Sequence, residues 1–595
     1  MPRMNAMDAV VRVLEDEGVR YAFGIPGAAI LPLYQALSTS QRIEHIVVRH
    51  EEGGTHAADG WARITGEPGI CIGTSGPAGT NMITGLYTAL ADSIPIICIT
   101  GQAATGVLHR ESFQAVDIVE IARPVTKWAV QVRETAQLPW VFRQAFRVAR
   151  QGRPGPVLID LPIDVQQGPE IEYDPLVDGR LPFDRPAPNG EAVAAAVAML
   201  LSAERPLILA GGGVVIADAA EQLRELAEYA QVPVTPTLMG KGAIPEDHPL
   251  YAGMVGIQTT HRFANQLFLE SDVVLAIGAR FGDRHTGELH TYRGDRKFIH
   301  IDVDPLQIGR VFAPDLGIVA DAKLALAALA QRARRVTPPR DAGDWVERVG
   351  RLRATMTRRT DFDDVPIKPP RVYRELNAFF GPDTIFVTAI GLYQIWSGQF
   401  QTTQRPRHYL CCGQAGPLGW EVPACIGAKL ARPEQTVVGV VGDYSFQFLM
   451  EEVAVAVQHR LPFVLVMVNN AYLGLIRQAQ IAYEMNFEVD IEYEGRGGHP
   501  GVDHVAVMEA MGAVGRRVTH PGEIAGALAW AVETSERRRV PALVEIMVER
   551  EANAAMGPAL DRIREWEPLD DEPVSAGGSR GGQIASPPHA LASST

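Results

Sequence analysis

Short, continuous apolar runs alternate with helical patterns along almost the whole chain. The runs lack polar–apolar alternation, which is typical of parallel strands covered on both faces by helices. Helical patterns such as 217–231 and 450–460 separate them. This order predicts an α/β fold with three doubly wound parallel-sheet domains. The predicted strands are 45–50, 96–100, 157–160, 207–210, 273–278, 298–303, 436–442 and 464–469.

Two Pro-rich segments divide the 595-residue chain into thirds of domain size. One covers 169–191, and the other covers about 336–370 and has a helical middle. The end of the chain is rich in Gly, Ser, Pro and Ala, a composition typical of disorder. The expected units are domains at 1–170, 190–340 and 366–557 and a disordered tail at 572–595.

Charge and composition limit the partners and the compartment. The net charge of −15 disfavours nucleic acid as a main partner. No uninterrupted apolar stretch is long enough to span a bilayer, and the start of the chain is an amphipathic helix pattern, not a signal peptide. The five cysteines lie in or beside apolar runs without a CxxC pair, so we expect buried free thiols in a reducing compartment. These features predict a cytoplasmic protein.

Two predicted strands end in polar residues suited to a metal. The strand 436–442 runs into Asp443, and the strand 464–469 is followed by Asn470. Ligands of open α/β sheets bind at the carboxyl ends of strands, and carboxylate and amide oxygens suit Mg²⁺. A helix after Asp443 would direct its N–H groups at a phosphate. Taken alone, Gly-Asp and Asn-Asn are common turn pairs.

The spacing of these residues resembles the signature of thiamine-diphosphate enzymes. Asp443 follows Gly442, and Asn470 lies 27 positions further along the chain. Asn470 is the second residue of an Asn-Asn pair at the end of an apolar strand. The resemblance implies that Asp443, Asn470 and the backbone carbonyl of Tyr472 hold Mg²⁺ for the diphosphate. Tyr444 departs from the Gly or Ala that usually follows the Asp in that family.

The segment 49–63 resembles the R-H-E-x-x-x-x-H stretch of the acetolactate synthase group of that family. The resemblance implies that Glu51 hydrogen-bonds the aminopyrimidine ring of the cofactor and so promotes loss of the thiazolium C2 proton to form the ylid. Burial against the cofactor would favour the protonated, donating form of Glu51. The alternative is that Glu51 and Glu52 are ordinary solvated charges at a helix start.

Further segments resemble the cofactor-binding loops of the same family. They are the Gly-rich loop 74–81, Phe113-Gln114, the loop 390–394 and the segment 416–419. The resemblance implies catalytic roles for Glu51, Gln114, Gly416 and Leu418. The residues expected to contact thiamine diphosphate are Pro26, Glu51, Gly76, Asn81, Gly391, Leu392, Tyr393, Gly416, Leu418, Gly442, Tyr444 and Ser445.

The middle third resembles the FAD-binding domain of acetolactate synthases. A Gly-rich turn follows a strand at 209–213, and Asp302 ends another strand, where it would meet a ribose hydroxyl. The alternative is a domain that kept the fold and lost the nucleotide. Because the implied reaction is redox-neutral, a bound FAD would be structural. The expected FAD contacts are Gly211, Gly212, Gly213, Thr237, Leu238, Met254, Gly256, Gly278, Arg280, Asp302, Val303, Asp321 and Ala322.

Four segments resemble the glyoxylate carboligase branch of the family: 108–118, 362–373, 413–424 and 469–480. The resemblance implies that two glyoxylate molecules are joined to tartronate semialdehyde with loss of CO₂. It also implies a small apolar substrate pocket, with Leu418 beside it, formed by Ile390, Leu473, Ile476 and Phe113. One departure is Glu51, because that branch carries Val there.

Three other functions stay open at this point. The segment 393–396, which begins with Tyr393, resembles acetolactate synthase, an enzyme that condenses pyruvate or another 2-oxo acid. The second alternative is a thiamine-dependent lyase that acts on 2-oxo or 2-hydroxyacyl thioesters. The third is a nonenzymatic flavin- or nucleotide-binding regulatory protein. The resemblance also implies a homodimer or homotetramer, in which Glu51 of one subunit faces the diphosphate domain of another.

Overall fold

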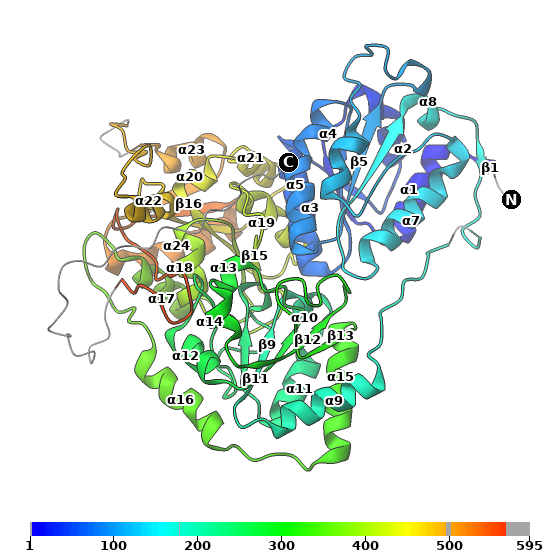
Figure 1. The fold of residues 1–595 in the computed structure, drawn as a ribbon. Coiled ribbons are helices and arrows are strands. Elements are labelled where there is room, and N and C mark those ends of the chain that lie inside the picture. Colours follow the sequence, from blue (N-terminus) through cyan, green and yellow to red (C-terminus); the bar gives the residue numbers. More distant parts are fainter. Residues whose placement is uncertain (1–2, 178, 496–500, 567–595) are drawn as a thin grey trace.

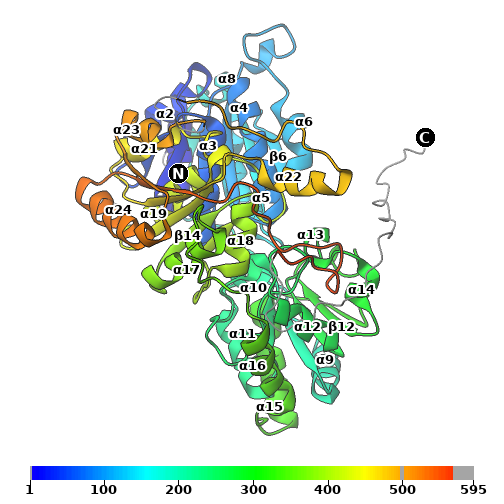
Figure 2. The same ribbon diagram turned by 90° about the vertical axis from the view of Figure 1, so that its left-hand side faces the viewer.

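The computed structural model describes residues 3–177, 179–495 and 501–566. These residues form three α/β domains, each built on its own parallel sheet (Figure 1). The first and third domains lie side by side, and the middle domain packs below both of them (Figures 1 and 2). The fold class predicted from the sequence is confirmed. The predicted tail at 572–595 lies outside the described residues.

The first domain holds a six-stranded parallel sheet. Its strands, in spatial order, are β3 (Glu44–Val47), β2 (Tyr21–Gly24), β4 (Gly69–Gly73), β5 (Ile96–Gln102), β7 (Val157–Pro162) and β6 (Trp128–Gln131). The predicted strand 45–50 ends early, at Val47, because His50 caps α3 (Glu51–Thr65) by accepting the N–H of Glu52.

The third domain repeats this arrangement. Its strands, in spatial order, are β15 (Tyr409–Cys411), β14 (Ile385–Thr388), β16 (Val437–Gly442), β17 (Val464–Asn469), β19 (Ala542–Met547) and β18 (Val514–Val518). When the six strands of each domain are numbered along the chain, their spatial order in both sheets is 2-1-3-4-6-5. The shared order indicates two related modules.

The middle domain has five parallel strands and helices on both faces. In β9 (Pro206–Ala210), Ile208 and Ala210 enter one hydrophobic core, while Leu207 and Leu209 enter another. Such burial of both faces explains why the strands read as continuous apolar runs. The remaining strands of this sheet are β10 (Val234–Pro236), β11 (Val273–Ile277), β12 (Lys297–Asp302) and β13 (Leu316–Val319). The helices over its two faces are α9 (Gly190–Ser202), α11 (Ala220–Ala230) and α15 (Ala322–Val336) on one, and α12 (Arg262–Glu270) and α16 (Asp344–Met356) on the other.

The segments between the domains contain few regular elements. The first segment opens with β8 (Ile171–Glu172), which pairs antiparallel with β1 (Arg3–Met4) outside the three sheets. The predicted helical middle of the second segment is confirmed as α16. Within the described residues, no helix combines the length and apolar character that crossing a membrane requires. All five cysteines are free and buried, as expected.

A close helix crossing joins the first and third domains. Helix α3 packs against α19 (Glu421–Ala431) through glycines on both sides. A Cβ atom on Gly427 would lie 2.0 Å from the carbonyl oxygen of Ala57, and one on Gly60 would lie 2.5 Å from that of Ala424. The two backbones therefore approach more closely than any larger residue allows.

Candidate active site

The predicted metal ligands gather at the carboxyl edge of the third sheet. Strands β16 and β17 are neighbours, with Gly442 paired to Val468, so Asp443 and Asn470 follow adjacent strand ends. The Asp443 carboxylate is buried, and this burial raises its pKa to about 6. The Asn470 side chain donates to the carbonyl of Arg550 at 3.1 Å, which leaves its amide oxygen available to a cation.

This donor set suits a hard divalent cation such as Mg²⁺. The described residues contain no group of three or more His, Cys, Asp or Glu side chains placed to hold a metal. Asp443, Asn470 and the backbone carbonyl of Tyr472 instead offer hard oxygen donors, and Mg²⁺ commonly completes its shell with water and phosphate oxygens. A buried carboxylate whose pKa is raised is also a group that a bound cation would stabilise. The helix after Asp443, α20 (Asp443–Phe446), is only one turn long.

Three glycine-containing loops surround this edge. The aromatic ring of Tyr393 lies where a Cβ on Gly391 or Gly442 would be, at 2.4 and 2.6 Å. Gly416 has a φ of +61° and packs beside Ile390. The predicted residues on these loops and beside the metal ligands are Ile390, Gly391, Leu392, Tyr393, Gly416, Leu418, Gly442, Tyr444, Ser445 and Leu473.

A buried glutamate that the sequence analysis missed ties these loops together. Glu421 begins α19, and its carboxyl group accepts hydrogen bonds from the hydroxyls of Tyr393 and Ser445. The hydroxyl oxygen of Ser445 in turn accepts the N–H of Gly419 at 3.0 Å. Complete burial raises the pKa of Glu421 to about 7. The only sequence signal was a carboxylate at the start of a mostly apolar helix.

The second predicted cluster lies at the carboxyl edge of the first sheet. Asn81 donates to the carboxylate of Glu51 at 2.9 Å, and Ser75 donates to Gln114 at 3.3 Å. A Cβ on Gly76 would meet Gln114 at 2.8 Å. Glu51 is buried, so it is not a solvated surface charge. Pro26 lies exposed in the loop after β2.

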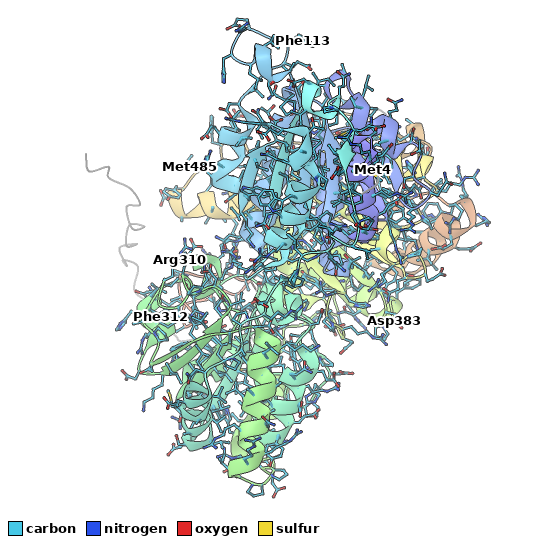
Figure 3. The ribbon with its side chains drawn as sticks, turned by 90° about the vertical axis from the view of Figure 1, so that its right-hand side faces the viewer. Met4, Phe113, Arg310, Phe312, Asp383 and Met485 are labelled. Carbon is cyan, nitrogen blue, oxygen red and sulfur yellow. The ribbon has the colours of Figure 1, made fainter. Side chains whose placement is uncertain are left out.

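The substrate-pocket residues are not brought together within one chain. Ile390 and Leu473 belong to the third domain and lie near the metal ligands. Phe113 is 86% exposed on a loop of the first domain, and Figure 3 shows it at the outer tip of that loop. Ile476, on α22 (Gly474–Gln480), is 52% exposed. Both apolar side chains therefore lack cover in a single chain.

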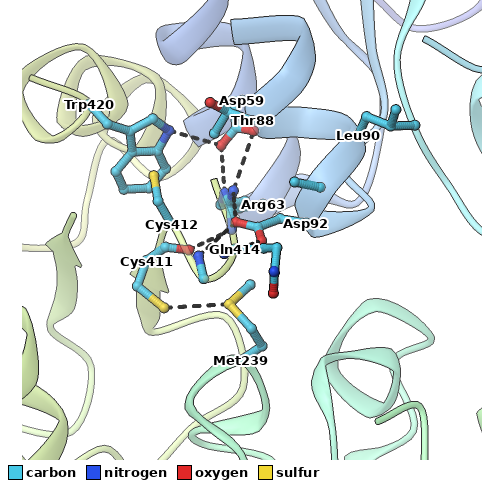
Figure 4. A network of polar contacts seen from close by, with 12 residues as sticks. Asp59, Arg63, Thr88, Leu90, Asp92, Met239, Cys411, Cys412, Gln414 and Trp420 are labelled. Carbon is cyan, nitrogen blue, oxygen red and sulfur yellow. Dashed lines mark hydrogen bonds and ion pairs between the residues drawn. The ribbon is translucent and has the colours of Figure 1, made fainter. Parts of the chain in front are cut away.

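A buried polar network joins the first and third domains and reaches the middle domain where the Cys411 thiol donates to the sulfur of Met239 at 3.6 Å (Figure 4). Arg63 forms ion pairs with Asp59 at 2.5 Å and with Asp92, the last residue of α5 (Ile83–Asp92), at 2.9 Å. Asp92 also accepts the backbone N–H groups of Gly413 and Gln414, at 2.9 and 3.0 Å. The network therefore holds the start of the segment that continues to Gly416.

A cavity opens at the carboxyl edge of the middle sheet and encloses about 1570 Å³, including the open space at its mouth. Asp302 lies in its wall, and burial raises the pKa of this carboxyl to about 6 against the effect of Arg153 and Arg280. Gly213 and Gly278 form a tight contact between two loops of the wall, because a Cβ on Gly278 would lie 2.5 Å from the Cα of Gly213. The concave, partly cationic site fits a nucleotide cofactor with a pyrophosphate.

Eleven of the thirteen residues expected to contact FAD line this cavity. Gly211 and Met254 do not line it, and Met254 is fully buried in the protein. The sequence analysis missed wall residues from the other two domains, among them Ser93, Arg153 and Gln414. No local motif marks them, because they reach the cavity only through the packing of the three domains.

Comparisons with known proteins agree with this geometry. The models of the thiamine pyrophosphate enzyme N-terminal TPP binding domain, central domain and C-terminal TPP binding domain match residues 4–121, 193–329 and 389–546. The chain is 51% identical to a glyoxylate carboligase of Escherichia coli, over 97% of this chain and 98% of the relative. It is 40% identical to a probable acetolactate synthase large subunit of Methanocaldococcus jannaschii, over 96% of each chain.

A third relative, an acetolactate synthase large subunit of Corynebacterium glutamicum, is 38% identical over 92% of this chain and 88% of its own length. All three family models follow one another along the chain in the order of the three sheets. Thiamine pyrophosphate is another name for thiamine diphosphate, so the resemblance read from the motifs is confirmed. This chain belongs to the thiamine pyrophosphate enzyme family.

Proposed function

We propose that this protein joins two glyoxylate molecules to tartronate semialdehyde with release of CO₂. The observation that supports this best is the 51% identity to a glyoxylate carboligase over nearly the full length of both chains. Ile390 and Leu473, beside the predicted metal ligands, would give the small substrate an apolar surface. Mass spectrometry of the product formed from glyoxylate alone tests the proposal, and no tartronate semialdehyde would refute it.

The residues at the carboxyl edges of the first and third sheets would have different roles in this reaction. Bound thiamine diphosphate would supply the electron sink for decarboxylation. Asp443, Asn470 and the carbonyl of Tyr472 would hold Mg²⁺ for the diphosphate. The Gly416 carbonyl and Leu418 would hold the pyrimidine end, and Glu51 would exchange a proton with the ring. Glu51→Gln should slow proton exchange at C2 at least tens-fold, on the order of general acid–base contributions.

A second copy of the chain would complete the site. Glu51 belongs to the first domain and Asp443 to the third, and the side chain of Glu51 bonds Asn81 within its own domain. The exposed apolar side chains of Phe113, Ile476 and Phe448 offer surface for a partner to cover. We therefore propose a homodimer or homotetramer. Sedimentation on dilution tests this, and an active monomer would contradict it.

The cavity of the middle domain would hold FAD in a structural role. Its support is the predicted set of residues around the cavity, with Asp302 at the strand end for a ribose hydroxyl and Arg280 for the pyrophosphate. The visible absorbance of the purified protein tests this proposal. A protein without flavin that takes up none on incubation would favour the domain that kept its fold and lost the nucleotide.

Acetolactate-type condensation of pyruvate is the second candidate. It is favoured by Glu51, where the glyoxylate carboligase branch carries Val, and by the 40% identity to a probable acetolactate synthase. Assays with pyruvate alone and with glyoxylate alone distinguish the two. The domain limits 1–170, 190–340 and 366–557 remain proposals, and so does a cytoplasmic location, which the five free buried cysteines support.

A further inference from the structure

Glu452 is a buried carboxylate that the proposed reaction does not use. It begins α21 (Glu452–Gln458) in the third domain, and its side chain points to the start of α3 in the first domain. Its Oε1 atom accepts the backbone N–H groups of Arg49 and His50, both at 2.9 Å. These are the two amides immediately before Glu51.

The buried environment of the Glu452 carboxylate lowers the stability of the fold. The side chain is fully buried, and burial raises its pKa to about 7. Its Oε2 atom is buried and has no hydrogen-bond partner among the described residues. A buried carboxylate with one oxygen unpaired destabilises the fold, so its position needs another reason.

The backbone of α3 is shaped to admit this carboxylate. A Cβ on Gly53 would lie 2.5 Å from Oε1 of Glu452, so only glycine leaves room for it. In the first turn of the helix, the amide of Glu52 donates to the His50 side chain at 3.2 Å. Buried N–H groups at a helix start need acceptors, and a negative charge there is favourable. Glu452 therefore holds the backbone before Glu51, while Asn81 holds the Glu51 side chain.

We propose that Glu452 is a positioning residue that orients Glu51 toward the cofactor by binding the two amides before it. This inference rests on the proposed function, in which Glu51 exchanges a proton with the pyrimidine ring. It assigns a role in proton exchange to a residue that contacts neither substrate nor cofactor. Binding of the diphosphate and of Mg²⁺ should not depend on it, because Asp443 and Asn470 are placed by the ends of β16 and β17.

The test compares two substitutions of Glu452. Glu452→Met fills the space without an acceptor, and Glu452→Gln keeps an oxygen for both amides. We expect Glu452→Met to slow C2 proton exchange of bound thiamine diphosphate at least about tenfold, since misplacing a reacting group by ~1 Å can cost 10²-fold. Glu452→Gln should stay within about threefold of the native rate, and the affinity for thiamine diphosphate with Mg²⁺ should change in neither.

A second readout needs no cofactor. In the protein without cofactor, hydrogen–deuterium exchange of the peptide around residues 46–54 should accelerate in Glu452→Met and not in Glu452→Gln. Gly53→Ala should behave like Glu452→Met, because its methyl group would displace the carboxylate. This variant carries the test if Glu452→Met fails to fold. Glu451→Gln, at the neighbouring partly buried position, is the matched control and should match the native protein.

Native exchange rates at C2 and at the amides in both Glu452→Met and Gly53→Ala would overturn the inference, as would equal slowing in Glu452→Gln and Glu452→Met. Glu51→Gln is measured in parallel. If Glu51→Gln leaves the C2 rate unchanged, the proposed role of Glu51 fails, and the amide exchange alone then decides whether Glu452 holds this backbone.

Discussion

The carboxylate of Asp92 accepts the backbone N–H of Gly413 at 2.9 Å across the boundary between the first and third domains. The same carboxylate is paired with the buried guanidinium of Arg63. Gly413 lines the cavity of the middle domain, and the chain continues from it to Gly416 at the candidate active site. One ion pair thus holds a loop that borders both predicted cofactor sites.

Replacing Asp92 should therefore cost much of the stability of the fold. In Asp92→Ala, Arg63 loses one of its two buried carboxylate partners and two backbone amides lose their acceptor. Removing one partner of a buried ion pair typically destabilises by about 3–5 kcal/mol. Chemical denaturation measures the change. Asp561→Ala, at an exposed position, should stay within about 0.5 kcal/mol of the native protein.

The glycine crossing of α3 and α19 gives a second prediction. In Gly427→Ala the new methyl group would lie 2.0 Å from the carbonyl oxygen of Ala57, so the helices must separate. Overpacking of this kind costs about 1–3 kcal/mol or more. Gly526→Ala, on an exposed helix position with open space around it, should instead stabilise by about 0.5 kcal/mol. If thermal unfolding showed equal changes in stability for Gly427→Ala and Gly526→Ala, close packing of α3 against α19 at Gly427 would be contradicted.

Local patterns predicted the parts of the fold that depend on local burial. All eight predicted strands are present, because strands covered on both faces must be apolar throughout. Other strands of the three sheets were not predicted, among them β18, which carries Arg516 and Arg517 in its centre. Arg517 is accommodated by pairing with Glu545 at 2.7 Å, a partner on the neighbouring strand that no local pattern indicates.

The candidate site divides in the same way. Asp443 and Asn470 were predictable because their positions follow from strand ends, and Glu51 because it lies beside a recognisable motif. Glu421 and Glu452 were not, since a glutamate at a helix start usually faces solvent. Both are buried here only because other loops and domains close over them. Such burial is a tertiary property, and a single sequence does not encode it locally.

Glu421 should make stability depend on pH in a defined direction. Its folded-state pKa, about 7, lies above the ordinary value of 4.5, so the native state keeps a proton that the unfolded chain releases. The free energy of unfolding therefore falls as pH rises between these values, by about 3 kcal/mol in total for this group. Glu421→Gln should remove that part of the decline in denaturation curves measured across the window. An unchanged slope would show that the carboxyl group ionises normally in the native state.

Asp302 should control flavin binding if the cavity holds FAD. Asp302→Ala removes the acceptor proposed for a ribose hydroxyl, and a lost hydrogen bond to a charged group costs about 1.5–3 kcal/mol, or roughly 10- to 150-fold in affinity. Flavin fluorescence titration measures the change. Asp295→Ala, on a turn beside the same sheet and outside the cavity wall, is the control. Native affinity in Asp302→Ala would exclude this contact.

Mg²⁺-dependent binding of thiamine diphosphate should require the carboxylate of Asp443. Its carboxylate is the only charged member of the proposed donor set, so Asp443→Ala should weaken Mg²⁺-dependent binding of thiamine diphosphate by roughly 100-fold. Chelation with EDTA should release the cofactor from the native protein and have little further effect on the variant. Calorimetric titration with and without Mg²⁺ measures both. Asp383→Ala, an exposed carboxylate in the same domain, should leave both titrations unchanged. Cofactor binding that survives EDTA in the native protein would contradict a metal bridge at Asp443.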